Sequence, residues 1–76
     1  MSGQVDLSAP RVAGTIIRII GDRNFCFVRC GEDDYFCHAS ALENCTFQQL
    51  REGADVRFVP TETKKGLRAE RVVLID

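Results

Sequence analysis

The segment RNFCFVRCGEDDYFCHAS, residues 23–40, concentrates the side chains of this chain that could bind or transform a ligand. It holds three of the five Phe residues, three of the four Cys residues, and the only His and Tyr. Phenyl rings stack on flat groups, whereas thiols and imidazoles ligate metals or serve as nucleophile and base. Stacking, metal binding and catalysis are therefore the three chemistries to be distinguished.

The Cys residues lack the spacing of a structural zinc site. They follow the pattern Cys26-x3-Cys30-x6-Cys37-His38-x6-Cys45, without paired C-x2-C motifs. Because Cys37 and His38 are adjacent, a strand would point them to opposite faces. We interpret the thiols as small core residues of a protein in a reducing compartment, and we predict neither a metal site nor a cofactor. Zinc binding and redox chemistry are the alternatives.

Length and charge limit the class of protein. A chain of 76 residues, 45% hydrophobic and 28% charged, predicts one globular domain. Apolar runs fall short of the roughly 20 residues of a membrane span, and MSGQVDLSAP lacks the apolar region of a secretory signal. We therefore expect a cytoplasmic protein with a flexible lead-in over residues 1–10 and a folded domain over residues 11–76. A net charge of −1 gives no overall attraction to nucleic acid, although eight of the ten cations are Arg.

Five segments have the alternating or β-branched pattern of strands: residues 11–20, 24–30, 34–39, 54–60 and 67–75. The turn GEDD joins the second and third, and the polar segment TETKKG joins the fourth and fifth. Between the third and fourth, residues 40–53 predict a short helix that begins at Ser40, with Glu43 completing a capping box, and ends at Gly53. This order predicts an all-β fold, a five-stranded antiparallel barrel of the OB type. The alternative is an RNA-recognition-motif sheet, which needs two full helices.

Alternation along the central hairpin divides its side chains between two faces. Because charged groups are costly to bury, the face with Arg and Asp is predicted to lie in water and the opposite face to line the core. An exposed row of aromatic rings usually marks a contact surface. The alternative is that both faces are covered and the Phe rings belong to the core. The outward set is Phe25, Phe27, Arg29, Asp34, Phe36 and His38; the inward set is Cys26, Val28, Cys30, Tyr35, Cys37 and Ala39.

Exposed rings beside Arg and His side chains predict a surface for unpaired nucleobases, since each stacked base contributes about 1–3 kcal/mol. We therefore expect single-stranded RNA or DNA as the partner of a monomer or weak dimer, with no small-molecule substrate. Catalysis is disfavoured because no nucleophile shares a face with His38. The alternative function is a protein-interaction barrel that offers its Phe rings to another protein.

Three motifs give residues 11–74 a resemblance to the cold-shock domain family. GTIIRI (14–19) matches the family's G-T-V-K-W-F opening, RNFCFV (23–28) its first ribonucleoprotein motif, K-G-F-G-F-I, and YFCHAS (35–40) its second, V-F-V-H-F-S. With one residue fewer in the turn near Gly31, further family positions are matched by Phe47, Leu50, Gly53, Val56, Phe58, Gly66, Ala69 and Val72. The resemblance implies a five-stranded antiparallel barrel whose 40–53 region is mostly loop with a short helical turn between the third and fourth strands, so the expected helix is shortened accordingly. It also implies binding of single-stranded RNA and DNA, often as an RNA chaperone.

The resemblance extends to individual residues of the site. Phe25, Phe27, Phe36 and His38 would form the stacking platform, with Phe47 reaching over it from the long loop. Asp34 takes the position of an acidic residue that accepts hydrogen bonds from a base edge. The cations predicted at this surface are Arg18, Arg23, Lys65 and Arg68.

The chain departs from the family at several positions of this surface. Ile17 and Arg18 stand where the family has Lys and an exposed Trp, and Ala39 replaces an aromatic residue. The loss of two stacking groups is expected to weaken binding by about 2–6 kcal/mol, leaving micromolar affinity of about −8 kcal/mol. Because simple alternation would turn Arg18 inward, we predict a bulge near Ile17 that turns it out. Asn24 replaces a Gly, a mild change because Asn tolerates positive φ.

Overall fold

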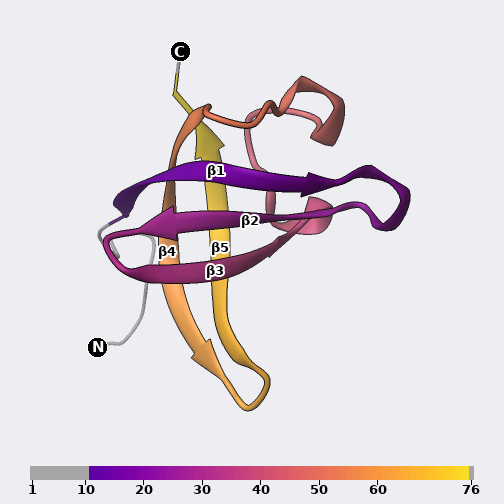
Figure 1. Cartoon of the computed structure of the whole chain (residues 1–76). Coiled ribbons are helices and arrows are strands. Elements are labelled where there is room, and N and C mark those ends of the chain that lie inside the picture. The colour runs from indigo at the N-terminus through magenta and orange to yellow at the C-terminus, as the bar shows by residue number, and fades with distance from the viewer. Residues whose placement is uncertain (1–10, 76) are drawn as a thin grey trace, which may run out of the picture.

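Five strands form a closed barrel in the computed structural model, which describes residues 11–75. The barrel order is β1-β2-β3-β5-β4 (Figure 1), and the predicted OB-type architecture is confirmed. An RNA-recognition-motif sheet is thereby excluded. The strands are β1 (Val12–Ile20), β2 (Phe25–Cys30), β3 (Asp33–His38), β4 (Asp55–Thr63) and β5 (Gly66–Leu74), and three short 3-10 turns are η1 (Gly21–Arg23), η2 (Ala39–Ala41) and η3 (Phe47–Gln49).

Strand β1 joins the two parts of the barrel. Figure 1 shows β1, β2 and β3 side by side, running across the β4–β5 hairpin. The first half of β1 pairs with β4 and its second half with β2, both antiparallel. On the other side, β3 and β5 meet in a parallel pair at Phe36 and Arg68, which closes the barrel. This closure places the tip of the β4–β5 hairpin beside the outer face of β3.

The core consists of ten buried apolar side chains drawn from every strand and from the loop between β3 and β4. Cys26 and Cys37 are 0% and 1% exposed and face each other across the β2–β3 ladder. Contact with the Cys26 thiol and burial raise the pKa of the Cys37 thiol, so this group stays protonated. The predicted inward orientation of these thiols is confirmed. The full set is Ile16, Cys26, Val28, Cys37, Ala41, Leu50, Val56, Phe58, Ala69 and Val72.

The predicted bulge in β1 is present. Ile16 pairs with Val28 and Arg18 pairs with Phe27, so Ile17 is the extra residue between two successive pairs. Ile16 therefore stays in the core at 1% exposure, while Arg18 turns out into solvent. Asn24, in the turn that follows, has φ 59° and ψ 40°, the left-handed conformation that Asn tolerates.

Between β3 and β4 the helical structure is limited to short 3-10 turns, as the resemblance to the cold-shock domain family implies, and the helix-like pattern does not extend over residues 40–53. The segment forms η2 and η3 through short-range backbone hydrogen bonds, and between them its backbone bonds to β5 of the barrel. Leu42 forms a parallel bridge with Val72, and the Glu43 N–H donates to the Val72 carbonyl over 2.9 Å. The expected capping pair has other partners: the Ser40 N–H donates to His38 Nδ1, and the Glu43 carboxylate pairs with Arg11 and Arg71. No helix within residues 11–75 is long and apolar enough to cross a membrane.

The β4–β5 hairpin is longer than predicted. Its ladder continues to the pair Thr63–Gly66, so Lys64 and Lys65 alone form the turn. The Thr63 hydroxyl holds this turn by donating to the Gly66 carbonyl over 2.9 Å and accepting from the Lys65 N–H over 3.1 Å. Gly66 has φ 122°, a conformation that other residues rarely adopt. The longer hairpin brings Lys65 to the outer face of the barrel.

Candidate nucleic-acid interface

Three phenyl rings form one cluster on the outer side of the β2–β3 hairpin, and we name it the aromatic face: Phe25, Phe27 and Phe36. Ring centroids lie 5.0 Å apart for Phe25–Phe36, 5.7 Å for Phe25–Phe27 and 6.2 Å for Phe27–Phe36. All three rings are half-buried, because each covers part of its neighbours. Such spacings are those of favourable edge-on and tilted aromatic pairs.

The aromatic face follows from strand alternation and register. Phe27 pairs directly with Phe36, and Phe25 pairs with His38. The residues between them, Cys26 and Cys37, point into the barrel. The prediction that these rings lie outside the core is therefore confirmed, and the alternative with both faces covered is excluded.

An ion pair lies at the turn end of the aromatic face. Arg29 Nε donates to Asp34 Oδ1 over 2.8 Å, and Arg29 Nη2 donates to Oδ2 over 3.3 Å. The two residues are cross-strand partners and both are exposed. The hydrogen bond from Arg29 lowers the pKa of the Asp34 carboxyl below its usual value. Asp34 is thus an ionised acceptor at neutral pH.

This contact predicts the titration behaviour of Asp34. Because the pKa of Asp34 is depressed in the folded state, the Arg29–Asp34 pair contributes its full stabilisation above about pH 3.9, the usual pKa of Asp. This stabilisation is lost as the pH falls through the lower pKa of the folded state. We expect the Asp34 carboxyl carbon, followed by NMR, to titrate below about pH 3.9. Replacing Arg29 by Ala should return the midpoint to that ordinary value. An unchanged midpoint in the variant would contradict the assigned contact.

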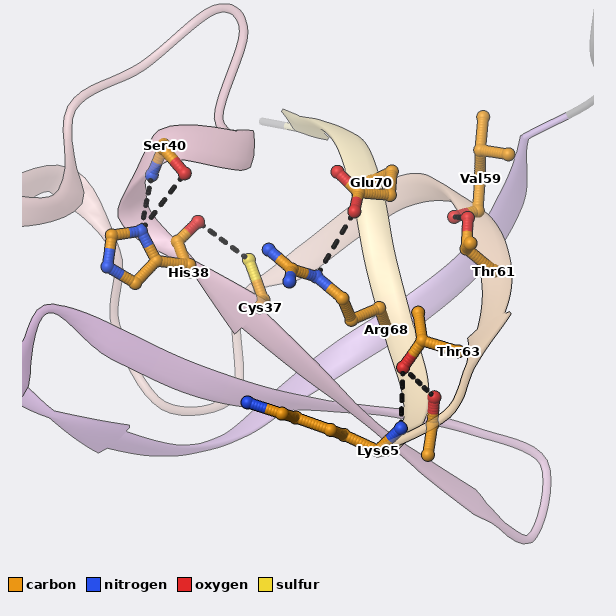
Figure 2. Close-up of polar contacts among 10 residues, drawn as sticks. Cys37, His38, Ser40, Val59, Thr61, Thr63, Lys65, Arg68 and Glu70 are labelled. Atoms are coloured by element: carbon orange, nitrogen blue, oxygen red, sulfur yellow. Dashed lines mark hydrogen bonds and ion pairs between the residues drawn. The ribbon is translucent and has the colours of Figure 1, made fainter.

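A groove of about 470 Å³ lies between the aromatic face and the β4–β5 hairpin. The Arg68 guanidinium carbon lies 5.7 Å from the centroid of the Phe36 ring, within the range of cation–π attraction. Arg68 Nε also lies 3.1 Å from Glu70 Oε2, and Figure 2 shows the Lys65 and Arg68 side chains extending from the hairpin towards β3. The groove is lined by Phe27, Asp34, Phe36, Thr63, Lys65, Gly66, Leu67 and Arg68.

His38 is held in one orientation at the end of β3. The Ser40 backbone N–H donates to His38 Nδ1 over 3.1 Å, and the Ser40 hydroxyl lies 3.0 Å from the same nitrogen. A backbone N–H can only donate, so Nδ1 is an acceptor and the neutral ring carries its hydrogen on Nε2. Figure 2 shows Nε2 pointing away from Ser40.

The remaining predicted residues lie at different distances from this groove. Arg18 is exposed and pairs across the β1–β2 ladder with Phe27, which places it beside the aromatic face. Arg23 is exposed at the end of η1, the 3-10 turn that connects β1 to β2. Phe47 is half-buried and packs against the core, outside the groove lining. Sequence reasoning missed Thr63, because the sequence predicts a turn where the hairpin continues, and it missed Leu67, which lies in a predicted strand but carries no chemical signal of a site.

A model of the "'Cold-shock' DNA-binding domain" matches residues 12–75. The chain belongs to the cold-shock domain family. It is similar to the cold shock protein CapB of Pseudomonas syringae pv. tomato, with 35% identity over 66 residues covering 86% of this chain and 96% of that protein. The cold shock-like protein CspLB of Listeria monocytogenes is 38% identical over 60 residues, 78% of this chain and 91% of that protein. The major cold shock protein CspA of Bacillus cereus is 35% identical over 63 residues, 82% and 94% of the two chains.

Membership in the cold-shock domain family agrees with the resemblance found in the three motifs. The family consists of nucleic-acid-binding proteins and not of enzymes, as the absence of a nucleophile on the His38 face predicts. Within residues 11–75 no group of three or more His, Cys, Asp or Glu side chains is arranged to hold a metal ion.

Proposed function

We propose that the protein binds single-stranded RNA or DNA by stacking unpaired bases on the aromatic face, and that it acts as an RNA chaperone or cold-shock-type regulator. The observation that carries this proposal is the cluster of three outward phenyl rings, 5.0 to 6.2 Å apart, on one hairpin. Every base offers a π-face, so such a surface binds single strands with little dependence on sequence.

The cations around the aromatic face support the same function. Lys65 and Arg68 line the groove, while Arg18 lies beside Phe27. These side chains can pair with phosphates of a strand whose bases stack on the rings. Since few phosphates are neutralised, the affinity should depend only modestly on salt.

A titration with end-labelled oligo-dT and oligo-U tests the proposal. Fluorescence anisotropy should report dissociation constants in the micromolar range, and a labelled duplex of equal length should bind more weakly because its bases are already stacked. Repeating the titration between about 50 and 200 mM salt separates stacking from phosphate contacts. Equal affinity for duplex and single strand would contradict a stacking interface.

A protein-interaction role is the second candidate, and Arg18 is the observation that favours it. Residue 18 lies beside the aromatic face, but Arg provides no aromatic ring there. The surface on which bases can stack is therefore smaller than it would be with the Trp that the family has at this position. Absence of oligonucleotide binding together with concentration-dependent self-association or capture of a defined partner would favour this function. Oligonucleotide binding in the titration above would exclude it as the main role of the face.

Adding a ring at position 18 should strengthen nucleic-acid binding. Because the bulge turns Arg18 out beside Phe27, the substitution Arg18→Trp places an indole next to the aromatic face without disturbing the core. One more stacked base corresponds to about 1–3 kcal/mol, or roughly 5- to 150-fold tighter binding. Oligo-dT titration measures the change. Arg57→Trp on β4, exposed and outside the groove, is the matched control and should leave the affinity unchanged.

A further inference from the structure

Cys26 and Cys37 bring two thiols into contact on the inner side of the β2–β3 hairpin, and the proposed function uses neither of them. The two residues are direct cross-strand partners and are 0% and 1% exposed. Contact with the Cys37 thiol lowers the pKa of Cys26, against the opposing effect of burial, whereas the same contact and burial raise the pKa of Cys37. Since the thiolate is the nucleophile of cysteine chemistry, Cys26 is the reactive sulfur and Cys37 its protonated partner.

The strand geometry brings this pair close to the dimensions of a disulfide. The Ala39 N–H donates to the Asn24 carbonyl over 2.9 Å, and hydrogen-bonded pairs recur at every second position of an antiparallel ladder, so Cys26 and Cys37 form the next such pair. The Cα atoms of these pairs lie about 5.5 Å apart, within the range of about 4.4–6.8 Å found in disulfides. The Cβ atoms, at about 4.5–5.5 Å, must approach each other by about 1 Å. A disulfide can therefore form here, but only under strain.

We infer that Cys26 and Cys37 are an oxidation site, at which a hydroperoxide produces a reversible cross-strand disulfide that disturbs the aromatic face. The Cys26 thiolate attacks one peroxide oxygen and becomes a sulfenic acid; the O–O bond breaks, and the other oxygen leaves as water or an alcohol with the proton that Cys26 gave up. The Cys37 sulfur then attacks the Cys26 sulfur, the S–S bond forms, and the hydroxyl group leaves with the Cys37 proton as water. Two thiols are thereby oxidised, and one hydroperoxide is reduced.

Strain makes this disulfide a temporary one. Strained disulfides are reduced more readily than structural ones, and in a reducing compartment disulfides are usually transient and redox-sensing. Because both sulfurs are buried, a small oxidant such as hydrogen peroxide should reach them, whereas bulky disulfides should not. Cys30 and Cys45 are only half-buried, and Cys30 has Asp33 instead of a Cys as its strand partner. Within residues 11–75, Cys26 and Cys37 are thus the Cys pair that strand register joins.

The aromatic face lies on the outer side of the hairpin, opposite the two sulfurs. Cys26 lies between two Phe residues of this face, and Cys37 follows the third. Drawing the inner Cβ atoms together rotates the two strands about their axes and moves the outward side chains apart. Oxidation also removes the Cys37 S–H, which donates to the His38 carbonyl over 3.7 Å (Figure 2). Displacing one ring should weaken oligonucleotide binding by about 5- to 150-fold, an effect that rests on the proposed function.

Peptide mapping of the full chain tests the oxidation site. Reduced protein is treated with hydrogen peroxide, the remaining thiols are blocked, and the chain is cleaved after Arg and after Glu. Cleavage after Arg isolates Cys26 in residues 24–29, and cleavage after Glu isolates Cys37 in residues 33–43. Mass spectrometry should find these two peptides linked, in chains of monomeric mass that have lost two hydrogen atoms. Dithiothreitol should separate the two peptides again.

Variants of the thiols connect the disulfide with oligonucleotide binding. In the wild-type protein, hydrogen peroxide should weaken the binding of labelled oligo-dT, and dithiothreitol should restore it. The combined substitution Cys30→Ser and Cys45→Ser keeps the inner pair and should show the same response. Cys37→Ala removes one sulfur of the pair, so this variant should bind oligo-dT with the same affinity before and after peroxide. Circular dichroism confirms that each variant is folded.

The outcomes separate the oxidation site from the function beneath it. If Cys26 and Cys37 stay unlinked, or if either is linked to Cys45 or to a second chain instead, the inferred site is overturned, and the wild-type map shows this even if Cys37→Ala does not fold. If the reduced protein binds no oligonucleotide, the proposed function fails, while the map still decides the site. Linkage without a change in affinity overturns the effect on the aromatic face. Linkage together with reversible weakening of binding supports the inference.

Discussion

Replacing Phe25 and Phe36 together by Ala is expected to weaken the binding of single-stranded oligonucleotides by about 2–6 kcal/mol, which raises a micromolar dissociation constant roughly 30-fold to more than 10⁴-fold. The two ring centroids are 5.0 Å apart, and both rings lie on the outer side of the hairpin. Each provides one stacking surface, so each single substitution should cost about 1–3 kcal/mol of binding free energy. Anisotropy titration with labelled oligo-dT and oligo-U measures the loss.

A matched control separates loss of stacking from loss of fold. Val59 on β4 is half-buried like the rings but lies outside the groove, so Val59→Ala should leave the affinity unchanged. Thermal unfolding should show that the Phe25→Ala and Phe36→Ala variants remain folded, because neither ring belongs to the buried core. Binding that survives both Phe substitutions would remove the aromatic face from the site.

Phe58→Ala is expected to lower the free energy of unfolding by about 3–5 kcal/mol. Phe58 is 0% exposed and is the largest fully buried side chain among residues 11–75. Its ring centroid lies 5.0 Å from that of Tyr35, so its removal leaves a cavity between β4 and β3. Small domains are stable by only about 5–15 kcal/mol, so this variant should lose a large fraction of its stability.

Urea unfolding followed by circular dichroism measures this loss. Arg57→Ala, the exposed neighbour of Phe58 on the same strand, is the control and should change the unfolding free energy by less than about 0.5 kcal/mol. Similar midpoints for the two variants would mean that Phe58 is not the central packing residue of the barrel.

Local alternation made the aromatic face predictable, whereas its surroundings depend on contacts distant in sequence. Phe25, Phe27 and Phe36 could be placed outward because the charge of Arg29 and Asp34 marks their face as the wet one. The bulge at Ile17 was predictable for a related reason, since regular pairing would have buried an Arg. Both predictions needed only neighbouring residues.

The structure departs from the local sequence pattern where tertiary contacts outweigh local preference. Residues 40–53 contain a helix-like pattern, yet Leu42 and Glu43 bond to Val72, far along the chain, and no α-helix forms. The groove could not be predicted either, because it exists only where β3 meets β5 at Phe36 and Arg68. The sequence also predicts a β4–β5 hairpin that is too short, because the polar residues around Lys64 and Lys65 are typical of a turn.

The buried thiols of Cys26 and Cys37, on the inner side of the β2–β3 hairpin, can be used to measure how readily the barrel opens. The chain contains no Trp, so intrinsic indole fluorescence cannot follow its unfolding. Cys26 and Cys37 are nearly inaccessible, so an alkylating reagent reaches them only when β2 and β3 separate, and the labelling rate measures the free energy of that opening. The half-buried Cys30 and Cys45 should be labelled sooner and serve as an internal reference. A bound oligonucleotide that stabilises the closed barrel will slow the labelling of the inner pair in proportion to its occupancy.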